Sequence, residues 1–192
     1  MIIPDVTLLI YAYNPEAPDH ERAREWWEAS LSATRPVGLP WGVMLGYLRL
    51  MTSRSIRIDP LLPAQAIGNI RSWLERPQVV VLNPGARHLD LIGQLFEAGG
   101  ASGQLTTDVH LAALAIENQA ELFSNDSDFS RFPGLRWTDP LRLGLDGAQR
   151  PRSYRLPTYR MGVRPGIDLD RALQLDAALE DEEIVRKLEL RK

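Results

Sequence analysis

Acidic side chains follow or begin three separate apolar stretches of the chain. Asp5 directly follows the apolar run Met1–Pro4, Asp108 lies near the start of an apolar helical pattern, and Asp126 and Asp128 follow another apolar run. Carboxylates that converge repel one another and raise each other's pKa unless a divalent cation neutralises them. Because oxygen-only ligands favour Mg²⁺ or Mn²⁺, these acids suit a metal that activates water and stabilises charge on a phosphoryl group.

Each of these acids also has an ordinary structural alternative. Asp5 and Asp108 are placed to cap the helices that follow them, and Asp126 and Asp128 are placed to shape a turn. These alternatives stay open from the residues alone.

Short apolar runs alternate with longer segments of helical periodicity. The pattern predicts strands over 1–4, 36–39, 79–82 and 121–124, an edge strand over 135–137, and helices over 6–13, 20–31, 41–52, 63–74, 86–98 and 108–118. This alternation is typical of an α/β fold with a central parallel sheet covered by helices on both faces. The carboxyl ends of parallel strands share one edge, where we expect the acids to meet.

Several finer expectations follow from side-chain periodicity. Residues 79–82 are predicted to form a buried strand, and Leu45 is placed with Val43, Leu48 and Met51 on the apolar face of helix 41–52. Glu28 is predicted to lie in water on helix 20–31. His20, His88 and His110 fall on separate helices, so they are interpreted as structural or exposed residues and not as zinc ligands.

The chain has 192 residues, a formal net charge of −3 and no cysteine. The absence of cysteine excludes disulfides, iron–sulfur clusters, Cys-based zinc sites and a thiol nucleophile. The start lacks the pattern of a secretory signal, and no stretch is long and apolar enough to span a membrane, so we expect a cytoplasmic location and no membrane partner. A change of composition near residue 143 predicts a domain over 1–143, a linker over 144–153 and a C-terminal tail over 154–192.

The tail is basic at its start and helical in pattern later. Residues 146–164 contain five arginines against the single acid Asp146, and the prolines favour extended backbone. From Asp168 onward the apolar spacing predicts a helix. The tail is therefore expected to be a cationic extended segment followed by a helix.

Taken together, the motifs of residues 1–143 resemble the PIN-domain ribonucleases, specifically the VapC-type toxins. The resemblance rests on Asp5-Val6, the helix Trp41–Thr52, Asp108–Ala115, Ser124–Phe129, Phe132–Leu135 and Asp139–Leu141. It implies a PIN-like α/β fold, dimerisation, and Mg²⁺- or Mn²⁺-dependent endoribonuclease activity in a type II toxin–antitoxin system. Asp5, Asp108, Asp126 and Asp128 would be the catalytic residues, with the first three as metal ligands.

Three other residues are candidates for supporting this site. Thr7 and Ser124 are placed to hydrogen-bond or line it, and Arg49 is placed to pair with a ligand carboxylate. One departure weakens the resemblance: these nucleases usually carry a glutamate three residues before the arginine, where this chain has Gly46. Loss of that carboxylate predicts weaker metal binding.

The tail resembles the toxin-neutralising carboxyl-terminal part of VapB-type antitoxins, through Tyr154–Arg164 and the Pro165–Asp170 stretch. The resemblance implies that an antitoxin-like inhibitor is joined to the toxin in one chain and binds in cis or to a neighbouring protomer. A guanidinium of the tail would replace the charge of the metal and block RNA. The inhibitory residues would be Arg155, Arg160 and Arg164, anchored by Leu156 and Tyr159.

Two other functions compete with this interpretation. A phosphatase of the haloacid dehalogenase class also uses an early and a late acid, but Thr7 stands where that class needs a second acid, and no lysine precedes the late acids. A catalytically weak PIN-like binding module is favoured by Gly46.

Overall fold

Five parallel strands form the centre of a computed structural model, which describes residues 1–99, 105–142, 153–169 and 178. The strands are β1 (Ile2–Pro4), β2 (Val37–Pro40), β3 (Val79–Leu82), β4 (Glu121–Phe123) and β5 (Arg136–Thr138). They lie in the order β3-β2-β1-β4-β5, and every neighbouring pair is parallel. The predicted parallel sheet is confirmed.

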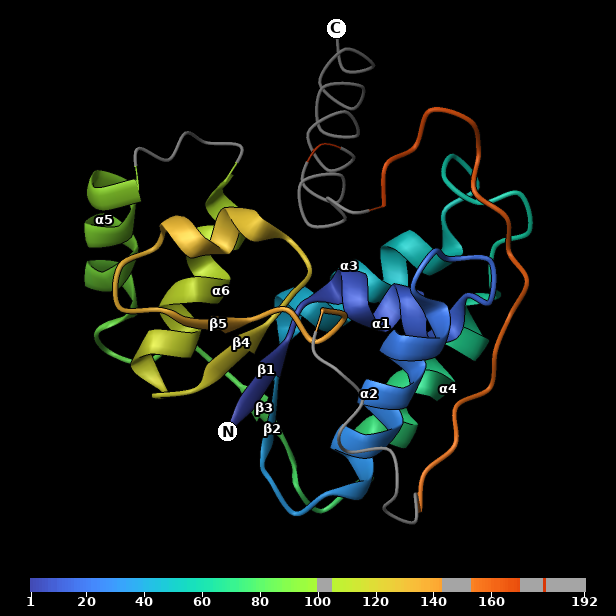
Figure 1. The fold of residues 1–192 in the computed structure, drawn as a ribbon, viewed down its shortest axis with the longest axis horizontal. Helices are drawn as coiled ribbons and strands as arrows, with labels where there is room; N and C mark the ends of the chain where they lie inside the picture. Colours follow the sequence, from blue (N-terminus) through green and yellow to red (C-terminus); the bar gives the residue numbers. More distant parts are fainter. Residues whose placement is uncertain (100–104, 143–152, 170–177, 179–192) are drawn as a thin grey trace, which may run out of the picture.

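Helices cover both faces of this sheet (Figure 1). The helices are α1 (Val6–Tyr13), α2 (His20–Ser32), α3 (Trp41–Thr52), α4 (Pro63–Leu74), α5 (His88–Gly99) and α6 (Thr106–Glu117), with a 3₁₀ helix η2 (Ser127–Arg131) between β4 and β5. Helices α1 to α4 lie on one side, and α5 and α6 on the other. This two-sided arrangement follows from the right-handed crossovers that parallel strands require.

The chain reverses its direction across the sheet between β1 and β4. It adds β2 and β3 on one side of β1, then returns to add β4 and β5 on the other. Pro4 pairs with Phe123, so Asp5 and Ser124 follow side by side at the carboxyl ends of adjacent strands. Such a reversal point is where open α/β sheets form their ligand crevice. Helix α6 leads into β4 and, as a crossover helix, begins at this same edge.

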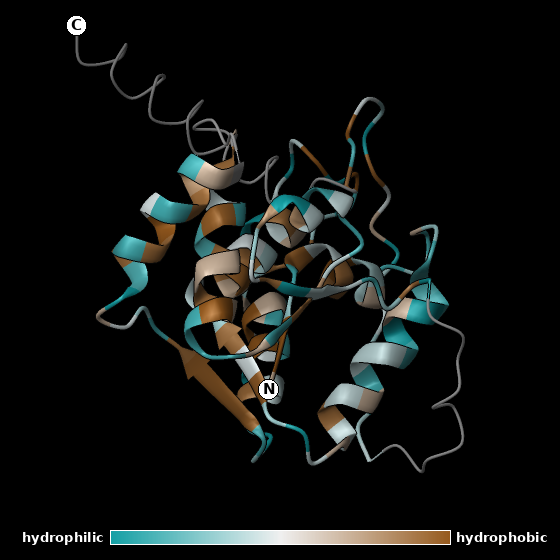
Figure 2. Cartoon of the chain, turned by 60° about the vertical axis from the view of Figure 1, so that its left-hand side comes forward, coloured by the Kyte–Doolittle hydropathy of each residue, from teal (hydrophilic) through white to brown (hydrophobic). Residues whose placement is uncertain are grey.

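The core is built mainly around α1, whose eight residues are all buried. This helix packs against both α2 and α3. Tyr13 at its end accepts a hydrogen bond from the Trp73 indole at 2.6 Å, so the buried hydroxyl is satisfied. Figure 2 shows hydrophobic colours on the strands and the inner helix faces, with hydrophilic stripes on the outer helices. A rigid core of this kind fixes Asp5 at the junction of β1 and α1.

Three side-chain expectations are wrong. Leu45 is 51 % exposed, because α3 buries the neighbouring face that contains Tyr47 and Leu50. Strand β3 is an edge strand, so Val80 and Val81 remain exposed. Glu28 is completely buried, for a reason given below.

Some predicted segments lie outside the described residues. They are the linker 144–153, except for residue 153, and nearly all of the helix after Asp168. Within the described residues, no helix has both the length and the apolar character needed to cross a membrane.

Candidate functional site

Asp5 is held at the reversal point of the sheet with its carboxyl group buried. Its N–H donates to the Phe123 carbonyl at 2.8 Å, and its Oδ2 accepts a 2.6 Å hydrogen bond from the Ser124 hydroxyl. Its Oδ1 is buried and has no hydrogen-bond partner among the described residues. Burial raises the pKa of Asp5 to about 6; the negative charge of Asp126 adds to this, while the Ser124 bond opposes it.

The Ser124 hydroxyl links the ends of β1 and β4. While it donates to Asp5, the same oxygen accepts the N–H of Asp126 at 3.0 Å. The Asp126 Oδ1 in turn accepts the N–H of Asp128 at 2.8 Å and caps η2. The carboxylate of Asp128 forms an ion pair with Arg131 at 2.7 Å. Asp126 therefore lies close enough to Asp5 for its negative charge to raise the pKa of Asp5, whereas the Asp128 carboxylate pairs with Arg131 on η2.

The other predicted site residues lie on three helices. Asp108 is buried in the first turn of α6, where the positive end of the helix dipole favours a carboxylate. Thr7 is buried in the first turn of α1, and its hydroxyl has no hydrogen-bond partner among the described residues. Arg49 is half-buried in the last turn of α3, and Gly46 is buried one turn before it.

The oxygen atoms at this edge have the chemistry of a divalent-cation site. The buried oxygens Asp5 Oδ1, Thr7 Oγ1 and Asn125 Oδ1 lack hydrogen-bond partners in the part of the chain described, and an oxygen-seeking ion would satisfy such atoms. No group of three or more Asp, Glu or His side chains in that part is gathered closely enough to hold a metal. To share one ion, the acidic side chains would have to lie closer together than they do in this arrangement.

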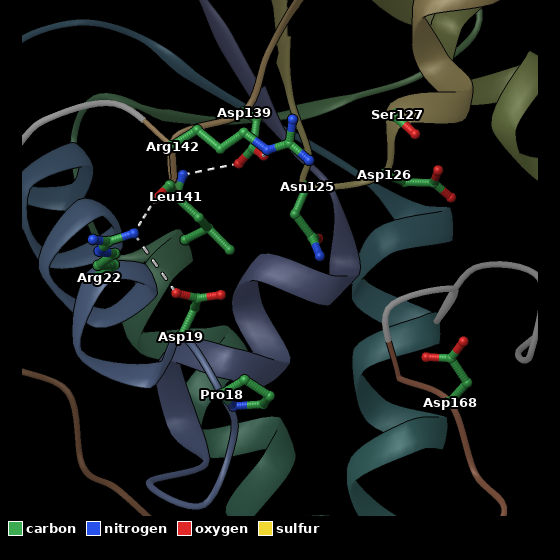
Figure 3. Close-up of a pocket in the computed structure, with 10 residues that line it drawn as sticks. All are labelled: Pro18, Asp19, Arg22, Asn125, Asp126, Ser127, Asp139, Leu141, Arg142 and Asp168. Atoms are coloured by element: carbon green, nitrogen blue, oxygen red, sulfur yellow. Dashed lines mark hydrogen bonds and ion pairs between the residues drawn. The ribbon is translucent and has the colours of Figure 1, made fainter.

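A polar pocket of about 440 Å³ opens beside these acids (Figure 3). Asn125 and Asp126 form the wall that it shares with the candidate site. Two arginines, Arg22 and Arg142, also line it, together with the carboxylates of Asp19, Asp139 and Asp168.

Residues 153–169, which we call the strap, run in an extended path along the outside of α1, α2 and α4 (Figure 1, orange). Buried Glu28 of α2 binds the start of the strap. It accepts hydrogen bonds from Arg155 Nη1 and the Leu156 N–H, both at 3.0 Å, and from Arg24 Nε of its own helix at 3.2 Å. This enclosure by the strap explains why Glu28 is not in water.

An aromatic contact fixes the middle of the strap. Tyr159 stacks on Tyr13 with the ring planes 9° apart, and its N–H donates to the Tyr13 carbonyl at 2.9 Å. The Tyr159 hydroxyl donates to Asn69, which itself donates to the Tyr47 hydroxyl. The strap therefore extends a polar network that begins in the core.

The end of the strap pairs with the segment between α3 and α4. The Met161 carbonyl accepts the N–H groups of Ile58 and Asp59, and the Arg164 N–H donates to the Ile56 carbonyl at 2.9 Å. The Arg164 guanidinium donates to the Arg54 carbonyl at 2.8 Å. Leu156 and Met161 are buried, so the strap is anchored by apolar side chains as well as hydrogen bonds.

These contacts show where the predicted inhibitory residues lie. Arg155 binds Glu28 and Arg164 binds a backbone carbonyl, so neither guanidinium is directed at Asp5 by these bonds. Arg160 is exposed. Leu156 is buried, and Tyr159 stacks on Tyr13.

Two side-chain clusters have no signal in the local sequence pattern. Glu28 gave no signal, because its burial depends on a segment 127 residues away. The sequence places His88 and His110 on separate helices, but His88 Nε2 lies 2.8 Å from His110 Nδ1, and His88 Nδ1 lies 3.4 Å from a Glu117 carboxylate oxygen. Only the pairing of α5 with α6 brings these residues together.

Comparison with known proteins places residues 2–135 in the PIN domain family. The chain is 46 % identical over 142 residues to the Mycobacterium tuberculosis protein named Ribonuclease VapC33, covering 74 % of this chain and 99 % of that protein. It is 38 % identical over 143 residues to Ribonuclease VapC37 of the same organism, with 74 % of this chain and 99 % of that protein covered. About a quarter of this chain therefore lies outside the match to either relative.

Solved structures share the fold. A VapBC-1 chain from nontypeable Haemophilus influenzae superposes with a TM-score of 0.53 at 20 % identity, covering 73 % of this chain and 98 % of that one. A chain of VapBC2 from Rickettsia felis, bound to a promoter DNA fragment, gives a TM-score of 0.51 at 19 % identity, covering 72 % and 98 %. From the family match and the close relatives together, the chain belongs to the PIN domain family and, within it, to the VapC group.

Proposed function

We propose that this chain is a metal-dependent endoribonuclease toxin of a VapBC-type toxin–antitoxin system, inhibited by its own strap. The observation on which the proposal depends is Asp5: a carboxyl group at the reversal point of the sheet, oriented by Ser124 and left with one buried oxygen that lacks a hydrogen-bond partner among the described residues. Buried groups with strongly perturbed pKa values cluster at functional sites.

In this proposal Asp5, Asp108 and Asp126 hold Mg²⁺ or Mn²⁺. When bound, the ion supplies a Lewis acid that activates water and stabilises charge on the phosphodiester. Ser124 orients Asp5 through a hydrogen bond and would favour its charged form. Asp128 acts through its backbone N–H, which fixes the Asp126 carboxylate.

Thr7 and Arg49 have supporting roles in the same proposal. The buried Thr7 hydroxyl, two residues after Asp5, is available to hydrogen-bond a ligand carboxylate. Arg49, in the last turn of α3, would orient one of the ligand carboxylates. Gly46 stands where these nucleases usually carry a glutamate, so the set of metal ligands is smaller by one acid, and weaker metal binding follows.

The likeness to VapBC complexes supports a VapB-like antitoxin as a partner, and RNA as the substrate. Here the strap itself lies along α1, α2 and α4 and is held by Glu28, Tyr13 and Asn69. We propose that this intramolecular docking is the inhibitory state, and that the PIN-like part forms a homodimer.

The test measures Mn²⁺-dependent cleavage of a single-stranded RNA by the full chain and by a chain that ends at Leu143. The shorter chain should cleave faster, because it lacks the strap, and Asp5→Asn should abolish cleavage in both. Asp59→Asn, at an exposed aspartate outside the site, is the matched control.

Two outcomes would overturn parts of this proposal. A shorter chain that is folded and binds Mn²⁺ but cleaves no RNA would favour the binding module that Gly46 suggests. Equal cleavage by the two chains would exclude inhibition by the strap. The match to the PIN domain family does not favour the phosphatase alternative, and Thr7 stands where that class needs a second acid.

A further inference from the structure

The pocket beside the candidate site contains the two arginines that could contact a polyanion there. Arg22 projects from α2, and its Nη1 donates to the Leu141 carbonyl at 2.8 Å and lies 3.9 Å from Asp19. Arg142 follows β5, and its Nε lies 3.1 Å from Asp139. The pocket volume of about 440 Å³ is within the range that binds small ligands or a nucleotide.

Asp139, in the loop after β5, orients the side chain of Arg142. Asp139 is nearly buried, accepts the Leu141 N–H at 2.9 Å with one oxygen and pairs with Arg142 through the other. The side chain of Arg142 nevertheless stays 80 % exposed, and that of Arg22 stays 56 % exposed. Arg22 is therefore oriented mainly by the Leu141 carbonyl and Arg142 by the Asp139 carboxylate, while most of each arginine side chain is exposed to solvent.

The strap adds a carboxylate to the same pocket. Asp168, near its end, lines the pocket together with Asp126 and the two arginines (Figure 3). The neighbouring Leu169 is buried, which ties this end of the strap to the domain. The strap thus contributes a negative charge, and not a guanidinium, to the space next to the candidate catalytic acids.

We propose that this pocket binds the RNA backbone, with Arg22 and Arg142 contacting a phosphate beside the scissile one, and that Asp168 of the strap closes the pocket to RNA. Guanidinium groups suit a phosphate because they donate parallel hydrogen bonds to its oxygens. The carboxylate of Asp168 lines the same space, and its negative charge would oppose binding of that phosphate. This inference rests on the proposed function, because it assumes that RNA is cleaved at Asp5 and Asp126.

The test measures affinity and not cleavage. A fluorescein-labelled single-stranded RNA is titrated with the full chain in 0.1 M salt and EDTA, which prevents metal-dependent cleavage, and anisotropy is recorded. Each phosphate contact with single-stranded nucleic acid changes the salt slope by about 0.7, which corresponds to about a fivefold change in affinity at this salt concentration. The variant R22Q/R142Q should weaken binding by at least about fivefold and reduce the salt slope.

Matched variants separate the pocket from overall charge. R71Q/R87Q removes two exposed arginines that do not line the pocket, so its affinity should stay within about twofold of wild type. R142Q alone leaves the Arg22 bond to Leu141 intact and should show a loss even if Arg22 contributes to stability. D168N should tighten RNA binding, whereas D59N should not.

The results distinguish this inference from the proposed function. If R22Q/R142Q and R71Q/R87Q bind RNA alike, or if D168N does not tighten binding, the inference is overturned even when Asp5-dependent cleavage is observed. If no variant cleaves an unmodified RNA but the affinity differences persist, the pocket binds RNA and the proposed catalysis fails.

Discussion

Asp5 and Glu28 are both buried carboxyl residues, but their surroundings differ in a way that separates function from structure. Glu28 accepts hydrogen bonds from two guanidinium groups and one backbone N–H. Asp5 receives one side-chain hydrogen bond and keeps a buried oxygen without a partner among the described residues. A satisfied buried acid stabilises packing, whereas an incompletely satisfied one is explained by a ligand that completes it.

Substitution of Glu28 tests the structural half of this contrast. Glu28→Gln keeps the size of the side chain but removes the charge that Arg155 and Arg24 bind, so it should lower the free energy of unfolding by about 1–3 kcal/mol. Urea unfolding measures this loss, and protease cleavage within the strap should become faster. The matched control is Glu21→Gln on the same helix, whose side chain is 75 % exposed. Unchanged protection of the strap in Glu28→Gln would show that Glu28 does not anchor it.

At the scale of single residues, the sequence predicted those contacts that follow from the order of the strands. Asp5 and Ser124 follow adjacent parallel strands, so their proximity follows from the order of elements. The burial of Glu28 and the pairing of His88 with His110 depend on how distant segments pack, which no local periodicity encodes.

The backbone of the strap requires glycine at position 162. Gly162 has φ +55°, and an added Cβ would lie 2.8 Å from the Ile58 side chain. Its N–H donates to Glu16 at 2.7 Å, which fixes the turn of the strap at this position. Both the left-handed conformation and the close approach require glycine.

Gly162→Ala should therefore loosen the strap. The left-handed conformation costs an alanine about 1–2 kcal/mol, and the contact with Ile58 adds to that cost. Hydrogen exchange at the Tyr159 amide, which donates to Tyr13, should accelerate. Gly166→Ala is the control, because Gly166 has φ +84° but no atom within 4 Å of an added Cβ. Equal acceleration in the two variants would mean that the Ile58 contact has no role.

Helices α5 and α6 are joined by a pH-sensitive contact. Burial lowers the pKa of His110, and the neighbouring His88 lowers it further; Glu117, which faces His88, has its pKa lowered mainly by the backbone N–H of Gly85. A histidine with a lowered pKa in the folded state binds fewer protons than in the unfolded state, so its contribution to stability falls as the pH falls below about 6.5.

Acidification should consequently loosen α5 from α6 before the sheet unfolds. Hydrogen exchange of α5 amides should accelerate between pH 7 and pH 5 in the wild type, after correction for the intrinsic pH dependence of exchange. His110→Gln should reduce this acceleration, whereas His20→Gln, on α2, should not. Identical pH profiles in wild type and His110→Gln would contradict the assignment.

On the scale of the whole molecule, a PIN-like α/β domain is covered along α1, α2 and α4 by a segment that lies outside the match to the PIN domain family. The order of strands and helices could be predicted because apolar runs and helical periods alternate clearly. The route of the strap could not, because its extended backbone has no period, and its contacts with Tyr13, Asn69 and Glu28 involve residues without any sequence signal.

The central claim is that Asp5, Asp108 and Asp126 share one divalent cation. The most direct measurement is a titration of the full chain with Mn²⁺, followed by electron paramagnetic resonance of the free ion. Each of Asp5→Asn, Asp108→Asn and Asp126→Asn should weaken Mn²⁺ binding by at least about tenfold, since second-shell changes alone cost about 10–100-fold. Asp59→Asn should bind Mn²⁺ like the wild type. Unchanged Mn²⁺ affinity in Asp5→Asn or in Asp108→Asn would contradict the claim.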